Sequence, residues 1–221
     1  MSPNLKIAVI IVNWKKYNIT KKCIDSVLNS SFTNFKIILI DNESNKKELN
    51  KILNEKIIFF SLTKNNGFAK AVNIGIKYSI ENRYDYVFLL NNDTIIDNFC
   101  LENLLDFSNT KSINIVQPLI FYMNNKSMIW NFGGGINYFF GFFNTLNKRK
   151  RIFKLKNIKK QSDWFTGCAC LIKSSVFEKV GFFDEDFFAY FEDVDFSLRL
   201  KELNYKIGLD VNSYLFHHES F

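Results

Sequence analysis

Acidic, amide and histidine side chains stand at three places in this 221-residue chain where an apolar run ends or a helical pattern begins. The triplet Asn91-Asn92-Asp93 follows one apolar run, acids cluster at 192–195, and His217 ends another apolar run. Carboxylates and histidine are the groups that hold divalent cations and move protons. Because active sites of α/β proteins gather at the carboxyl ends of strands, this placement indicates an enzyme acting on a phosphorylated ligand.

The acids at 192–195 are the first candidates for proton transfer. Like charges packed together raise pKa values, which suits a general base. Asp195 stands four residues before Arg199, and we expect the two to form an ion pair. Glu192 and Asp193 have no partner at that spacing. Their other interpretation is stabilisation of the positively polarised first turn of a helix.

Four further positions carry groups that could hold a nucleotide or a cation. Asp93 offers one carboxylate, which suffices where substrate phosphates and water supply the remaining ligands, although a polar turn is the alternative. Asp41 ends an apolar run, where it could accept hydrogen bonds from a base or ribose or could begin a helix as its N-cap. Gly67 precedes a helical pattern, so backbone N–H groups could approach a phosphate there. A lone histidine in a strand is more often structural, but the place of His217 at the end of a run favours a ligand.

The first half of the chain alternates between buried strands and amphipathic helices. Strands are predicted at 7–12, 36–40, 57–60 and 86–90, with helices at 20–29 and 68–80 and a short polar helix after 44. This alternation predicts a parallel sheet covered by helices.

The second half has a weaker pattern. Strands are predicted at 113–122, 128–132 and 164–173, a turn or close backbone approach at 133–135, and a helix at 190–203. Ser175 and Glu178 have the spacing of a capping box, and Gly181 suits the end of that short helix. Residues 147–160 are crowded with Lys and Arg and are predicted to be a mobile loop.

The composition is that of a folded globular protein, with 47% hydrophobic and 23% charged residues. Aromatic residues reach 17%, which predicts that some rings lie on a surface meeting an acceptor, a partner or a membrane. The net charge of +7 favours an anionic partner. The four cysteines form no CxxC pair and are expected to be buried thiols, with Cys168 and Cys170 on one face of a strand. Neither a leader nor an apolar run of ~18 residues is visible, so we expect a cytoplasmic protein, with contact to the inner membrane surface left open.

Taken together, the motifs resemble the family 2 glycosyltransferases, in particular their rhamnosyltransferase-like branch. The motifs that carry the resemblance are, in order, Ile11-Val12-Asn13-Trp14, Asp41-Asn42-Glu43-Ser44, Asn66 to Gly75, Leu89 to Thr94, Gly181 to Glu185, Phe188 to Asp195 with Arg199, and His217 with Ser220. The resemblance implies a GT-A fold, an α/β architecture with a Rossmann-like, mostly parallel central sheet and helices on both faces. It implies a single catalytic domain over 1–221, with a nucleotide-binding half at 1–95 and an acceptor-binding half at 96–221. Asn204 stands where the family often has glycine, and Asn tolerates the left-handed conformation.

The resemblance also implies an inverting transfer of a sugar, such as rhamnose or galactose, from a UDP- or dTDP-linked donor with the help of Mg or Mn. The acceptor would be a hydroxyl of a growing cell-surface glycan or lipid-linked saccharide. Asp193 would be the catalytic base, Glu192 would line the acceptor side, and Asp93 and His217 would contact the metal. The residues implied at the nucleotide are Asn13, Asp41, Asn66, Gly67, Asn73, Asn91 and Asn92.

Two other functions remain open from the sequence. A nucleotidyltransferase or another nucleotide-sugar enzyme on a related scaffold is expected to carry a Gly-rich, basic phosphate loop after the first strand, where this chain has Asn13-Trp14-Lys15-Lys16. A nucleic-acid-binding protein would use the basic segment 147–160 and exposed aromatics. That function leaves the acids at 192–195 unexplained because acids repel phosphate, and we therefore expect no nucleic-acid partner.

Overall fold

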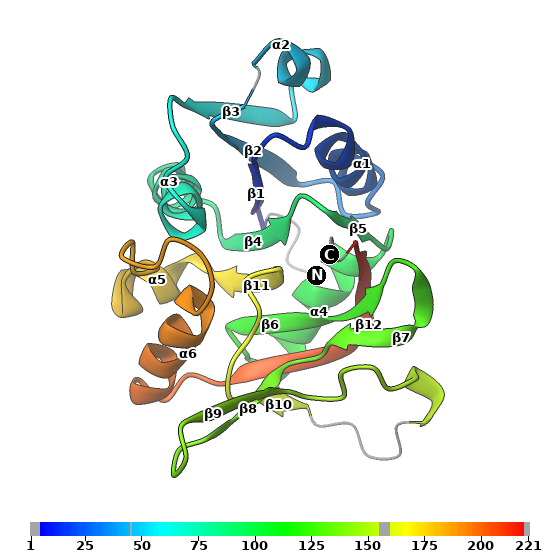
Figure 1. Cartoon of the computed structure of the whole chain (residues 1–221), viewed down its shortest axis with the longest axis vertical. Coiled ribbons are helices and arrows are strands. Elements are labelled where there is room, and N and C mark those ends of the chain that lie inside the picture. The colour runs from blue at the N-terminus through cyan, green and yellow to red at the C-terminus, as the bar shows by residue number, and fades with distance from the viewer. Residues whose placement is uncertain (1–4, 45, 155–159, 219–221) are drawn as a thin grey trace.

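The computed structural model describes residues 5–44, 46–154 and 160–218 and contains one large mixed sheet with helices on both faces (Figure 1). The strands are β1 (Ile7–Asn13), β2 (Phe35–Asn42), β3 (Ile57–Leu62), β4 (Tyr86–Asn91), β5 (Thr94–Ile96), β6 (Ile115–Tyr122), β7 (Asn125–Asn131), β8 (Gly134–Asn137), β9 (Phe142–Thr145), β10 (Gln161–Ser162), β11 (Ala169–Lys173) and β12 (Ile207–His217). The helices are α1 (Tyr17–Leu28), α2 (Lys46–Leu49), α3 (Phe68–Glu81), α4 (Cys100–Lys111), α5 (Ser174–Val180) and α6 (Glu192–Glu202), with 3₁₀ turns at η1 (Asn50–Ile52) and η2 (Ile152–Lys154). The strand order along the sheet is β10-β12-β6-β11-β4-β1-β2-β3, with β5 beside β12 and β7 beside β6.

The parallel part of the sheet consists of β3, β2, β1 and β4. Successive residues of β1 point to opposite faces, so Val9 packs against α1 while Ile10 packs against α3. Because both faces are covered, β1, β2 and β4 contain nearly continuous runs of buried apolar residues. The predicted alternation of strands and helices in this half is confirmed.

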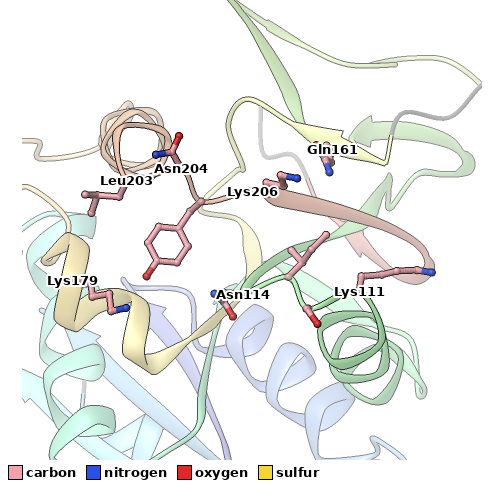
Figure 2. A pocket seen from close by; sticks show the side chains of 10 residues that line it. Lys111, Asn114, Gln161, Lys179, Leu203, Asn204 and Lys206 are labelled. Carbon is pink, nitrogen blue, oxygen red and sulfur yellow. The ribbon is translucent and has the colours of Figure 1, made fainter.

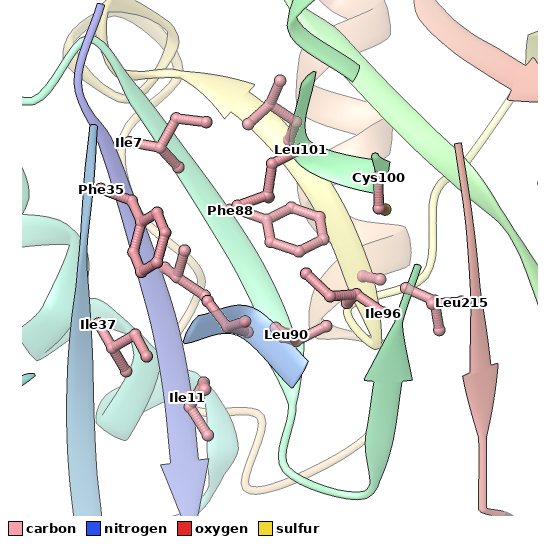
Figure 3. Packing of buried hydrophobic residues seen from close by; sticks show 14 of the residues in the cluster. Ile7, Ile11, Phe35, Ile37, Phe88, Leu90, Ile96, Cys100, Leu101 and Leu215 are labelled. Atoms are coloured by element: carbon pink, nitrogen blue, oxygen red, sulfur yellow. The ribbon is translucent and has the colours of Figure 1, made fainter. Parts of the chain in front are cut away.

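The second half extends the same sheet with mixed strand directions. β11 runs antiparallel to both β4 and β6, and β12 runs parallel to β6. Helix α4 covers the face that α1 covers, whereas α5 and α6 pack on the face of α3. Figure 3 shows the first of these faces, where Phe88 of β4 lies with Leu101 of α4 and Leu215 of β12 in one buried cluster. The sequence patterns did not predict α4.

The strand predicted at 164–173 begins only at Ala169. Cys168 therefore lies before the strand and packs on the α1 face, while Cys170 packs on the α3 face. The prediction that the two thiols share a face is wrong, because strand alternation does not extend to Cys168. The prediction of buried free thiols is confirmed, and burial raises the pKa of both groups well above the usual range.

The ends of α5 and the glycine turn at 133–135 test three local predictions. The capping box is wrong, since α5 begins at Ser174 and the residue before it makes no side-chain cap. Gly181 does end α5, where it has φ of 87° and donates its N–H to the Phe177 carbonyl at 2.9 Å. The close backbone approach is found at Gly134, where an added Cβ would lie 1.8 Å from the Trp164 ring.

The basic segment is attached to the sheet at its beginning. Arg149 donates its N–H to the Ile129 carbonyl at 2.8 Å, and Lys150 accepts one from Ile129 at 2.9 Å. These hydrogen bonds tie the start of the segment to β7, and residues 155–159 lie outside the described residues. The mobility of the segment stays a prediction. Among the described helices, none is both long and apolar enough to cross a membrane.

Candidate functional site

A cavity of about 690 Å³ lies where the two halves of the sheet meet. Its wall includes Asp93 beyond the end of β4, His217 at the end of β12, and Glu192 and Asp193 at the start of α6. Residues far apart in the chain thus converge on one space, as the sequence predicted for the acids and the histidine. Aromatic rings from β7, β9 and the segment before α6 complete much of the wall.

Asp93 and His217 face each other inside this cavity. The Nε2 of His217 lies 3.2 Å from Oδ1 of Asp93, and 8% of the His217 side chain is exposed. Antiparallel pairing of β12 with β5 places His217 opposite Thr94, and the His218 N–H donates to the Asp93 carbonyl at 2.8 Å. The Trp130 ring packs on the imidazole with ring centroids 4.2 Å apart. The pair is therefore held by backbone pairing and by ring packing.

The geometry of this pair fits a divalent cation. Oδ1 of Asp93 is buried and has no hydrogen-bond partner among the described residues, although the imidazole is close. Two ligand atoms about 2.1 Å from one cation and at right angles lie about 3.0 Å apart, which is near the observed 3.2 Å. Within the described part of the chain no third His, Cys, Asp or Glu joins them. Any further ligands would have to come from a diphosphate and water.

Asp193 is fixed in place by two backbone N–H groups. Gly167 donates to its Oδ2 at 2.8 Å and Val194 donates to its Oδ1 at 2.9 Å. Burial raises the pKa of Asp193, and these two hydrogen bonds oppose that rise. The carboxylate is thus oriented toward the cavity while each oxygen keeps a lone pair for a ligand proton.

Glu192 has a different environment from its neighbour. Its side chain is buried, and its Oε2 has no hydrogen-bond partner among the described groups. Burial first, and the charge of Asp193 second, raise the pKa of Glu192 to about 7. Asp195, by contrast, forms the predicted ion pair with Arg199 at 2.8 Å. The structural role expected for Asp195 is therefore confirmed.

A hydrogen-bonded chain joins the ends of β2, β1 and β4. Asn13 lies opposite Asp41 in the sheet and donates from Nδ2 to Asp41 Oδ1 at 3.2 Å. Thr20 donates to Asn13 Oδ1 at 2.6 Å, and Asn92 donates to Thr20 at 2.8 Å. Asp41 is fully buried, and its Oδ2 has no partner among the described residues. Thr20 was missed from the sequence because it looks like an ordinary first-turn helix residue.

The residues around the start of α3 are engaged in internal contacts. Phe68 donates its N–H to the Phe188 carbonyl at 2.7 Å. The sequence led us to expect backbone N–H groups at this helix start to approach a phosphate, but the first N–H of α3 is already used by this hydrogen bond. Gly67, with φ of 81°, is needed there because an added Cβ would lie 2.4 Å from that carbonyl oxygen. Asn66 donates its N–H to Asn42 at 2.9 Å.

Asn73 joins α3 to the segment before α6. Its amide nitrogen donates to the Phe183 carbonyl at 2.8 Å, and its oxygen accepts the Phe183 N–H at 3.1 Å. Glu185 accepts a further hydrogen bond from the same amide at 3.2 Å. Its contacts in this structure are therefore structural, and a nucleotide contact stays a prediction.

Comparison with known proteins decides the family. A family model described as glycosyl transferase family 2 matches residues 8–181. The chain belongs to this family. It is 26% identical over 208 residues to the low-salt glycan biosynthesis hexosyltransferase Agl10 of Haloferax volcanii, covering 91% of this chain and 64% of that protein. It is 27% identical over 186 residues to the dTDP-rhamnosyl transferase RfbF of Shigella flexneri, covering 81% of this chain and 60% of that protein.

Two further likenesses agree with this assignment. The rhamnosyltransferase WbbL of Escherichia coli is 27% identical over 210 residues, which cover 87% of this chain and 75% of WbbL. A crystal structure of GalNAc-T7 with UDP, GalNAc and Mn²⁺ superposes with a TM-score of 0.79 over the whole chain and 45% of that protein. At 19% identity this likeness shows the GT-A fold alone. The family 2 chain described here spans about three fifths of the length of Agl10 and RfbF.

The family 2 chain has a second cavity, of about 860 Å³, at the opposite ends of β6 and β12 (Figure 2). Lys111, Lys179 and Lys206 stand around it. Its lining residues include no acid and no histidine. Of these two cavities, the first is the one whose described wall contains acids and a histidine, and it is therefore the candidate active site.

Proposed function

We propose that this chain transfers a sugar from a nucleotide diphosphate donor to an acceptor hydroxyl, with inversion at the anomeric carbon. The observation that carries the proposal is the shared cavity, in which an oriented, partly buried Asp193 carboxylate lies with the Asp93–His217 pair. The Asp193 carboxylate suits removal of a proton, and the Asp93–His217 pair suits a cation that holds a diphosphate. We propose a UDP- or dTDP-linked donor, with rhamnose as one sugar, since RfbF is described as a dTDP-rhamnosyl transferase.

The reaction is a single displacement. The acceptor oxygen forms a bond to the anomeric carbon as the bond from that carbon to the diphosphate oxygen breaks, and the nucleoside diphosphate leaves with the bonding electrons. The hydroxyl proton passes to the Asp193 carboxylate. The N–H groups of Gly167 and Val194 keep this carboxylate oriented, and their hydrogen bonds oppose the rise in its pKa that burial causes. No second nucleophilic carboxylate is needed, unlike in retaining glycosidases.

Asp93 and His217 would hold a divalent cation, Mg²⁺ or Mn²⁺. When bound, the cation supplies positive charge that neutralises the leaving diphosphate. The nearby amides Asn91 and Asn92 are proposed to contact the nucleotide diphosphate. Asn91 lines the cavity, and Asn92 is tied to the chain of side chains that ends at Asp41.

The nucleotide base or ribose is proposed to lie over the ends of β1 and β2. The unpartnered Oδ2 of Asp41 can accept an N–H of the base or a ribose hydroxyl, while Asn13 holds Oδ1. Asn66, Gly67 and Asn73 shape the neighbouring start of α3. Their role at the nucleotide is indirect in this proposal, since their polar groups already have protein partners.

The acceptor is proposed to be a hydroxyl of a growing glycan or lipid-linked saccharide. Aromatic side chains before α6 and on β9 suit the apolar face of a sugar ring, and Glu192 lies among them on the acceptor side. Glu192 contacts the acceptor in this proposal, and with its raised pKa it can exchange a proton near neutrality.

The test is a screen of UDP- and dTDP-linked sugars, each with Mg²⁺ or Mn²⁺ and with simple glycoside and lipid-linked acceptors. The expected result is acceptor-dependent release of nucleoside diphosphate with at least one donor, and a product whose anomeric configuration is opposite to that of the donor by NMR. A product that retains the donor configuration would refute the single displacement. Release of pyrophosphate in place of nucleoside diphosphate would indicate a nucleotidyltransferase.

A further inference from the structure

The β8–β9 hairpin ends in a group of exposed aromatic side chains, here called the hairpin tip and comprising residues 138–143. Its exposed rings are those of Tyr138, Phe139, Phe140, Phe142 and Phe143. Phe139 is 88% exposed and Phe142 is 69% exposed. In Figure 1 the hairpin forms part of the lower edge of the molecule, away from the parallel strands.

The fold makes little use of the hairpin tip. The three buried clusters found among the described residues include none of its side chains. Phe139 and Phe140 pack edge to face with centroids 4.8 Å apart, so the rings mainly contact one another. A Cβ added at Gly141 would meet no atom within 4 Å. A contiguous apolar surface that the core does not need marks a site of interaction.

The segment of the chain that contains the hairpin tip is strongly basic. Residues 107–162 contain ten Lys and Arg and no Asp or Glu. The exposed residues 148–151, Lys-Arg-Lys-Arg, follow β9 after Leu146 and Asn147 and lie at the base of the hairpin, where they pair with β7. At the tip itself, Lys201 of α6 lies with its Nζ 3.6 Å from the centre of the Tyr138 ring. A second copy of this chain would bring the same positive charge to the contact and would be repelled. The charge therefore favours an anionic partner.

We propose that the hairpin tip inserts into the interface of an anionic lipid bilayer while residues 148–151 bind the lipid head groups. Aromatic side chains favour the region between water and acyl chains, and basic residues beside them add attraction to acidic lipids. A projecting hairpin with a few bulky rings suits insertion into the bilayer interface better than binding of a nucleic acid, because the bases of a nucleic acid usually stack along a basic groove. A membrane contact was left open from the sequence, and the structure assigns it to this hairpin.

Docking by the hairpin tip would also position the active site. Phe143, Thr145 and Lys148 line the catalytic cavity, and the Phe143 ring lies 6.1 Å from that of Phe191, next to Glu192. A bilayer that holds the tip would thus lie close to the cavity, where a lipid-linked acceptor presents its hydroxyl. This last step rests on the proposed function, whereas membrane binding itself does not.

The test is sedimentation of the 221-residue chain with vesicles of phosphatidylglycerol or of phosphatidylcholine, at low and high salt and without donor or acceptor. Phe139→Ser/Phe140→Ser removes two rings of the tip, and Arg149→Gln/Lys150→Gln/Arg151→Gln removes charge. Phe99→Ser is the matched control, because Phe99 is also more than half exposed but stands before α4. Circular dichroism checks that each variant is folded.

We expect the wild type to prefer phosphatidylglycerol, and the double Phe variant to bind it roughly tenfold or more weakly. The triple charge variant should lose most binding at low salt and show little salt dependence, since salt screens the head-group attraction. Phe99→Ser should bind like the wild type. Because no sugar substrate is present, these results are independent of glycosyl transfer.

Four outcomes would overturn the proposal. One is that wild-type protein remains in the supernatant with both vesicles, and another is that the double Phe variant sediments as the wild type does. A dimer in sedimentation equilibrium that the double Phe variant abolishes, without vesicle binding, would assign the tip to a second copy of the chain. Binding to single-stranded RNA with the same dependence, again without vesicle binding, would assign it to nucleic acid.

Discussion

Replacing Glu192 by Gln is expected to stabilise the protein above pH 7 and to change its stability much less at pH 5. Burial raises the pKa of Glu192 from 4.5 to about 7 in the folded state. Between these two values the unfolded chain releases the proton while the folded protein retains it, so rising pH favours unfolding. Each unit of pKa difference corresponds to ~1.4 kcal/mol, which gives roughly 3 kcal/mol of destabilisation above pH 7. Gln resembles the protonated carboxyl and removes this pH dependence.

Urea unfolding at pH 5 and pH 8 measures the effect. The difference in free energy of unfolding between Glu192→Gln and wild type should be about 2 kcal/mol larger at pH 8 than at pH 5. Asp193 remains in both proteins, so the effect of its own burial cancels in this difference, and its interaction with Glu192 is part of the measured effect. Glu178→Gln, at an exposed site on α5, is the matched control. Equal differences at the two pH values would refute the reasoning that burial of Glu192 opposes its ionisation.

Two further predictions concern the backbone beside the site and the cation pair. Gly67→Ala should lower the free energy of unfolding by about 3 kcal/mol or more, because strain at φ of 81° adds to a clash with the Phe188 carbonyl. Gly141→Ala should lower it by only about 1 kcal/mol, since the added Cβ meets open space. Equal losses in chemical denaturation would contradict the clash. Asp93→Ala and His217→Ala should each weaken Mn²⁺-dependent donor binding measured by calorimetry, with non-additive effects in the double variant, as the two atoms 3.2 Å apart would share one cation. Donor affinity that is unchanged by chelation and by both substitutions would exclude the shared cation.

The sequence predicted the parallel half of the sheet well because its elements have strong local patterns. The β1 run of six apolar residues and the stripe of α3 are recognisable without knowledge of their neighbours. Helix α4 escaped prediction because Asn, Ser, Asp and Thr, which favour helices weakly, stand between its apolar residues.

The positions of the acids and of His217 at element ends were also visible, and the structure brings them to one cavity. The hydrogen bonds that hold these side chains in place could not be predicted from the sequence. Gly167 and Asp193 are 26 residues apart, and the Phe188 carbonyl meets the start of α3 from far along the chain. Such contacts depend on how distant segments pack, which no local spacing reports. For the same reason, the composition of the basic segment does not indicate that its backbone is hydrogen-bonded to β7.

The central claim is that Asp193 removes the proton from the acceptor hydroxyl, and a single-turnover measurement of Asp193→Asn tests it most directly. Asp186→Asn, an exposed acid in the segment before α6, is the matched control. With saturating donor, acceptor and Mn²⁺, the rate of transfer by Asp193→Asn should fall by ~10²–10⁴-fold, as expected for loss of a general base. The donor dissociation constant should stay within about twofold, because a general base acts on the acceptor and the donor groups are untouched. Transfer by Asp193→Asn within a few-fold of wild type, with Asp186→Asn unaffected, would contradict the account.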